Sequence, residues 1–140
     1  MKNILWVSIS LQVKAEMMPW KTEYLDDLNI IETTLFGIFP VNEIREVVKS
    51  VLDLVSKQGT KRLLVDCSHL VHSNTVFDIY ELPIYYESVK LDRGLKQAVV
   101  LPISKDSRKN VEFYETVTRN RGYNVCVHKD RQAAIKWLLE

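Results

Sequence analysis

The sequence has few of the residues that build small stapled folds or glycine-rich loops. Of its 140 residues, two are cysteine, four are glycine and four are proline. Cys67 and Cys126 are too few for a disulfide framework, and their separation does not match zinc-finger spacing. The four glycines are too scattered to form a G-x-G-x-x-G or P-loop motif. These absences exclude a disulfide scaffold, a zinc finger and a glycine-loop nucleotide site.

The chain also lacks an excess of either charge and a long apolar run. Nineteen basic residues face 18 acidic ones, and the net charge is +1. Such a balance gives no overall field to attract nucleic acid, and no apolar run reaches the ~20 residues that span a bilayer. Hydrophobic residues make up 46% and charged residues 26%, which excludes a disordered chain. We therefore expect a soluble, cytoplasmic, single globular domain with no transmembrane segment and no nucleic-acid partner.

The first residues superficially resemble a signal peptide. Lys2 precedes an apolar stretch over 4–11, but serines interrupt the stretch, and no small-x-small cleavage site follows it. We interpret residues 1–17 as an N-terminal extension or an extra strand, and residues 18–140 as the domain.

Hydrophobic periodicity predicts strands that alternate with helices. Strands over 20–24 and 29–36 are expected to form a hairpin around Asp26-Asp27. Apolar residues spaced by three and one from Ile44 to Val55 predict a helix that Asn42 caps and Gly59 ends. Further strands are expected over 62–67, 97–103 and 123–128. A helix is expected from residue 75, with Pro83 in the first turn of its continuation and Gly94 at its end. Two more helices are expected over 106–121, where Gly122 ends the helix, and over 131–139.

This order predicts an α/β fold with a central mixed, mostly parallel sheet and covering helices. Ligands of such sheets tend to lie outside the carboxyl ends of the strands, here near 66–73, 102–106 and 128–130. His69, His72, Asp66 and His128 fall there, but a loop gives them no fixed common face, so we expect no metal and no cofactor. A Ser73–His72–Asp66 triad lacks a nucleophile-elbow sequence, and we expect no catalytic residues.

Two segments remain as candidate sites. Ser73 and Thr75 precede a helix start, where they can cap free N–H groups or carry a phosphate as a switch. The segment that follows is rich in aromatic residues, which can pack in the core, line an apolar ligand cavity or form a partner surface. Its members are Phe77, Tyr80, Ile84, Tyr85 and Tyr86.

Residues 20–140 resemble the SpoIIAA-like proteins, bacterial relatives of the STAS domain that are sometimes grouped with CRAL-TRIO lipid-binding domains. The resemblance rests on Leu63-Leu64-Val65-Asp66, Phe77-Asp78-Ile79-Tyr80-Glu81-Leu82-Pro83, the stretch from Phe113 to Val125, and Ala134-Ile135-Lys136-Trp137-Leu138. It implies the same α/β fold and a regulatory module rather than an enzyme. In anti-sigma-factor antagonists a serine of an Asp-Ser-Ser-Gly motif is phosphorylated, and the corresponding stretch here, His72-Ser73-Asn74-Thr75, lacks the aspartate and the glycine.

The leading hypothesis is a non-enzymatic STAS-type interaction module that binds a protein partner or its own copy as a homodimer. The alternative is a small apolar-ligand or lipid carrier of CRAL-TRIO-like type, with a cavity under the aromatic segment.

Overall fold

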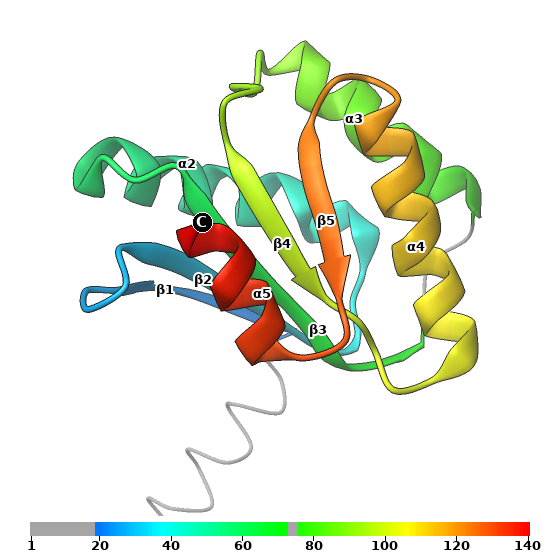
Figure 1. Ribbon diagram of the computed structural model, residues 1–140. Helices are drawn as coiled ribbons and strands as arrows, with labels where there is room; N and C mark the ends of the chain where they lie inside the picture. The colour runs from blue at the N-terminus through cyan, green and yellow to red at the C-terminus, as the bar shows by residue number, and fades with distance from the viewer. Residues whose placement is uncertain (1–18, 73–75) are drawn as a thin grey trace, which may run out of the picture.

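Five strands form one sheet in the computed structural model, which describes residues 19–72 and 76–140 (Figure 1). The strands are β1 (Trp20–Leu25), β2 (Ile30–Ile38), β3 (Arg62–His72), β4 (Lys96–Val100) and β5 (Asn124–His128). The helices are α2 (Ile44–Gln58), α3 (Val76–Ser88), α4 (Lys105–Arg119) and α5 (Arg131–Leu139), with a short 3-10 turn η1 (Val41–Glu43) before α2.

The strands lie in the order β1-β2-β3-β4-β5, so each strand pairs with the next one along the chain. β1 and β2 are antiparallel, and their hairpin closes at Asn29, whose φ of 55° lies in the left-handed region that asparagine tolerates. The other three pairs are parallel. The expected α/β fold with a mixed, mostly parallel sheet is therefore confirmed, and β2 to β5 all end at one edge, called here the carboxyl edge.

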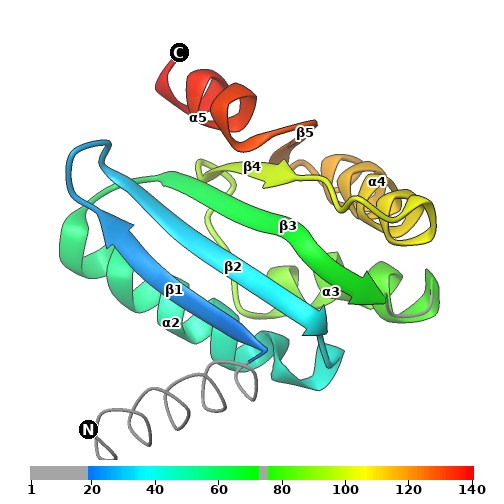
Figure 2. The ribbon, with the colours of Figure 1, turned by 90° about the horizontal axis from the view of Figure 1, so that it is seen from below.

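The helices cover the two faces of the sheet unequally. α2, α3 and α4 lie on one face, and α5 lies on the other (Figure 2). On the α5 face, Ala134 and Leu138 pack against Ile30, Leu64 and Ala98.

An ion pair between the start of α5 and β2 adds to this packing. The Arg131 guanidinium donates two hydrogen bonds to the buried Glu32 carboxylate, at 2.9 and 3.1 Å. This paired geometry fixes the first turn of α5 over the sheet.

The two expected features at the ends of α2 have different outcomes. Gly59 does end α2, with φ of 71° and its N–H donating to the Val55 carbonyl oxygen at 2.8 Å. The expectation that Asn42 caps the helix is wrong, because Asn42 lies inside η1 and the cap position falls on Glu43. The Glu43 carboxylate accepts a hydrogen bond from Trp20 Nε1 at 2.9 Å instead of capping, which ties α2 to β1.

The end of the third helix also differs from the expectation. α3 stops at Ser88, and Lys90 closes it with φ of 56° while Leu91 N donates to the Tyr86 carbonyl oxygen. The expectation that Gly94 ends this helix is wrong, because α3 has already ended at Ser88. Pro83 lies in the middle of α3 and not in a first turn.

Candidate functional site

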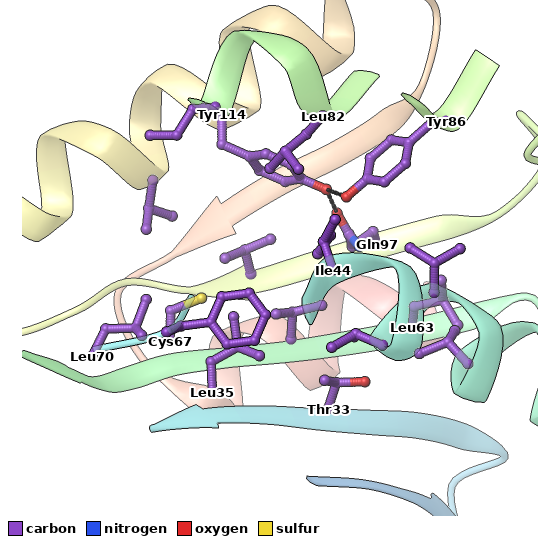
Figure 3. Close-up of a pocket in the computed structure, with 18 of the residues that line it drawn as sticks. Thr33, Leu35, Ile44, Leu63, Cys67, Leu70, Leu82, Tyr86, Gln97 and Tyr114 are labelled. Carbon is purple, nitrogen blue, oxygen red and sulfur yellow. Dashed lines mark hydrogen bonds between the residues drawn. The ribbon is translucent and has the colours of Figure 1, made fainter. Parts of the chain in front are cut away.

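A cavity of about 150 Å³ lies between the sheet and its three-helix face (Figure 3). The side chains of Thr33, Val65 and Val99 contribute from three neighbouring strands, whereas Val48 reaches it from α2. α3 and α4 provide further walls, and aliphatic side chains make most of the surface. The helices that border this space rest on the central strands, so the cavity adjoins the hydrophobic core.

Two tyrosines and a glutamine form a polar wall of the cavity, and Asn110 of α4 is a further polar residue of the lining. The Tyr114 hydroxyl donates to Gln97 Oε1 at 2.7 Å. Because the Tyr114 proton is used in that bond, the Tyr86 hydroxyl is the donor in the 2.9 Å contact between the two tyrosines. Figure 3 shows the three groups meeting on one side of the cavity, with the tyrosines coming from α3 and α4 and the glutamine from β4.

These two hydrogen bonds leave some polar groups of the wall without a hydrogen-bond partner among the described residues. Within residues 19–72 and 76–140, neither N–H of the Gln97 amide has a hydrogen-bond partner. The other hydroxyl in the wall of the cavity, on Thr33, is paired with Thr22 at 3.1 Å. The polar wall therefore presents amide donors that a ligand oxygen can satisfy.

The titratable groups of the cavity stay neutral. Burial raises the pKa of Cys67 to about 12, with a smaller contribution from the charge of Asp66. Burial also raises the pKa of Tyr86 to about 12 and that of Tyr114 well above its ordinary value. None of the described residues that line the cavity is Asp, Glu, Lys, Arg or His. The lining is uncharged throughout the physiological pH range.

Aromatic rings pack around Tyr86 in the polar wall. The Tyr86 ring meets the rings of Tyr114 and Tyr123 edge to face, with centroids 6.4 and 5.8 Å apart. Edge-to-face contacts of this kind hold ring orientations as well as positions.

A second feature lies at the carboxyl edge of the sheet. The aliphatic side chains of Ile38, Val71 and Ile103 are 70%, 70% and 82% exposed there. Ile38 ends β2, Val71 is next to the end of β3, and Ile103 follows the end of β4. We call these three residues the carboxyl-edge patch.

The comparisons with known proteins bear on the fold alone. No protein-family model matches the sequence, and no curated protein matches it significantly. The structure is similar to the crystal structure of an anti-sigma factor antagonist from Mycobacterium paratuberculosis, with a TM-score of 0.59 and 14% sequence identity. The match covers 86% of this chain and 95% of that one. This chain has the fold of an anti-sigma factor antagonist.

That SpoIIAA-like, STAS-type fold is the one that the sequence resemblance implied. The described part of the chain contains no helix that is both long and apolar enough to cross a membrane.

The aromatic segment splits between the interior and the surface. Tyr86 is buried and lines the cavity, whereas Tyr80 and Ile84 are 47% and 41% exposed. Tyr85 is half-buried, and the Arg45 guanidinium of α2 lies over its ring at 5.4 Å. The Phe77 side chain is outside the described part of the structure. Of the four predicted residues whose side chains are described, Tyr86 is the one that lines the cavity.

The two predicted switch residues cannot be placed. Ser73 and Thr75 lie outside the described residues, between the end of β3 and the start of α3 in the sequence. Their role stays a prediction, and so does the N-terminal extension over 1–17.

The histidines at the carboxyl edge have separate surroundings. The His69 ring stacks on Phe36 at 5.6 Å, and the His128 ring packs near Trp137 at 5.5 Å. Asp66 accepts hydrogen bonds from the Ser68 backbone N–H and hydroxyl. Residues 19–72 and 76–140 contain no group of three His, Cys, Asp or Glu side chains that could hold a metal ion.

Sequence reasoning missed most of the cavity. Its walls from α2 and the strands have the pattern of an ordinary core, which gives no signal of an empty space. Besides the aromatic segment, an available signal was Gln97, a polar residue near the start of an otherwise buried strand.

Proposed function

We propose that this chain is a non-enzymatic, cytoplasmic regulatory module of the STAS type, which acts by binding a partner protein. The likeness to an anti-sigma factor antagonist supports a role in protein recognition, since the name of that protein states that it opposes another protein. The two cysteines are free thiols, which fits a reducing compartment.

The carboxyl-edge patch is the observation that carries this proposal. Single exposed aliphatic side chains are common, whereas exposed apolar side chains that gather in one place mark interaction sites. Here three neighbouring strands each bring a strongly exposed aliphatic side chain to the same edge of the sheet. The partner chemistry that fits is an apolar protein surface that buries Ile38, Val71 and Ile103 together.

The proposed regulation is phosphorylation at Ser73 or Thr75. These residues come two and four positions after Val71 in the sequence. A phosphate there would add nearly two negative charges within four residues of Val71 in the sequence, which opposes the docking of an apolar surface.

The experiment places a photo-reactive side chain at Ile103 in the full chain, in cells of the native host. We expect irradiation to link it to one discrete protein. Val89, which is 40% exposed beyond the end of α3 and away from the patch, is the matched control position. The linked protein is then purified, and its affinity is measured for wild type, Val71→Asp and Val89→Asp.

We expect Val71→Asp to weaken binding by about tenfold or more, as a charge in the centre of an apolar interface does, and Val89→Asp to leave it unchanged. A linked species of twice the chain mass would identify the partner as a second copy. Equal effects of the two substitutions, or no linked protein, would overturn the proposed surface.

The switch has its own readout with the same partner. Ser73→Asp and Thr75→Asp should each change partner affinity and leave the melting temperature nearly unaltered. A large loss of stability with unchanged affinity would leave these residues a capping role only.

The cavity favours a second candidate function, that of a carrier or sensor of a small apolar ligand. Native mass spectrometry of untagged protein from its own host tests this directly. Bound mass that leaves on activation, together with a stoichiometric apolar molecule in an organic extract, is the expected result. Clean extracts from several hosts would contradict it.

A further inference from the structure

We propose that the cavity binds one small, uncharged molecule about the size of a single six-membered ring, which carries an oxygen that accepts a hydrogen bond from Gln97. This inference rests on the second candidate function above and defines its ligand class. It does not depend on the carboxyl-edge patch.

Volume sets the size of the ligand. The cavity measures about 150 Å³. An apolar cavity of this volume, engineered in another protein, stays dry and admits benzene. A phospholipid or a long-chain fatty acid is several times larger, so the ligand is not a membrane lipid.

The lining sets the charge of the ligand. Its described residues bear no charged group, and burial keeps the Cys67 thiol and the Tyr86 hydroxyl protonated. A carboxylate or phosphate would lose its hydration without gaining a counter-charge, which is strongly unfavourable. Anionic ligands are therefore rejected, whatever their size.

The polar wall sets the functional group. Tyr114 uses one of the two lone pairs of Gln97 Oε1, whereas both N–H groups of the amide are unpaired within the described part of the chain, so the amide offers a ligand two donors and one remaining acceptor site. Tyr86 gives its proton to Tyr114, so its oxygen can still accept a hydrogen bond. A hydroxyl on the ligand can accept from Gln97 and donate to Tyr86, and a carbonyl can accept from Gln97.

Phenol and toluene form the matched probe pair, because their hydroxyl and methyl groups have nearly the same size. Binding to the full chain is followed at pH 7 by methyl NMR and by calorimetry, with benzoate as the charged probe. Toluene is intrinsically the more hydrophobic, so the informative quantity is the change in the phenol-to-toluene affinity ratio when Gln97 is altered.

The test variant is Gln97→Met, which keeps the chain length and removes the amide. We expect its phenol-to-toluene affinity ratio to fall about fivefold, the effect of one net hydrogen bond. Gln97→Leu should give the same change and serves if the methionine variant does not fold. Val48→Phe, on the half-buried cavity face of α2, should abolish binding of both probes by filling the space.

Three results would overturn the proposal. The first is that neither phenol nor toluene binds wild type at millimolar concentration. The second is an unchanged affinity ratio in both Gln97 variants, and the third is benzoate binding as strong as that of phenol. None of these results alters the cross-linking expected at Ile103, so this inference and the proposed regulatory function fail separately.

Discussion

At the scale of single residues, His128 is the group whose environment opposes its charge. Its Nε2 is buried and has no hydrogen-bond partner among the residues that the structure describes. Burial lowers the pKa of the His128 imidazole below its ordinary value of 6.5, although the nearby carboxylates of Glu115, Asp130 and Glu140 act in the opposite direction. The folded chain therefore holds this ring in its neutral form.

This arrangement predicts a loss of stability in mild acid. Between the ordinary pKa and the lowered folded pKa, the unfolded chain binds more protons than the folded chain at this position. The free energy of unfolding should fall as the pH drops through 6.5 toward the folded pKa, and this component should be absent in His128→Gln. Urea unfolding of both proteins at a series of pH values from 7.5 to 5 measures it.

The matched control is His69→Gln, which removes an imidazole from an exposed position beside Phe36. We expect the free energy of unfolding of His69→Gln to fall with decreasing pH as it does in the wild type, and in contrast to His128→Gln. An identical pH profile for wild type and His128→Gln would show that the buried ring does not contribute.

The role of a single residue could be predicted from the sequence where its type favours one backbone conformation. Gly59 was identified as a helix end because glycine adopts the left-handed conformation without strain. It was wrong at Asn42, where a polar residue before a helix suggested a cap, because the capping position follows from the backbone path through η1. The role of Gln97 could not be predicted, since its partner Tyr114 comes from another element.

At the scale of elements, α2 and α3 end in different ways. α2 ends on Gly59, and a Cβ built there would meet nothing within 4 Å. α3 ends on Lys90, a side-chain-bearing residue at φ of 56°, with the Lys90 N–H donating to the Glu87 carbonyl and the Leu91 N–H to the Tyr86 carbonyl. This paired pattern is the Schellman motif, in which glycine is the favoured residue.

The two ends should therefore respond to substitution in opposite directions. Gly59→Ala should destabilise the protein by about 1–2 kcal/mol, a purely conformational cost because the space is open. Lys90→Gly should stabilise it by about 0.5–1 kcal/mol, because it relieves the left-handed strain. Chemical unfolding measures both.

Gly59→Asn is the control for the first substitution, since asparagine tolerates the left-handed region and should cost less than alanine. A destabilising Lys90→Gly would mean that the lysine side chain contributes more than its backbone strain costs.

Most elements were predictable because their hydrophobic periodicity is local. α5 has the bounds that the sequence predicted, and it begins where Asp130 accepts a hydrogen bond from Ala133 N. The end of α3 was misplaced because glycine was the expected signal and Lys90 fills that position. β3 was underestimated by five residues, because its extension past Cys67 depends on pairing with β2 through an irregular register.

At the scale of the whole molecule, the arrangement of layers followed from the alternation of strands and helices. A cavity was raised only as an alternative under the aromatic segment, and its walls from α2, α4 and the sheet were not predicted. A void depends on how tightly three separate helices pack on one sheet, and each helix face alone reads as ordinary core. The consequence is a cavity of about 150 Å³ in a chain of 140 residues. Most protein cores contain few voids larger than a water molecule.

The void predicts an unusual sensitivity to pressure. Unfolding eliminates internal voids, so pressure favours the unfolded chain in proportion to the empty volume, typically with volume changes of about 20–100 mL/mol. We expect Val48→Phe, which places a ring in the cavity, to reduce the volume change of unfolding. High-pressure fluorescence or NMR at constant pH and temperature measures it.

Val55→Phe is the matched control, because Val55 is a half-buried valine on the same helix that does not line the cavity. It should leave the volume change near the wild-type value, whatever it does to stability at ambient pressure. Addition of toluene to wild type should act like Val48→Phe, since a bound ring occupies the same space. If Val48→Phe and toluene both left the volume change at the wild-type value, the void would not be the source of the pressure response.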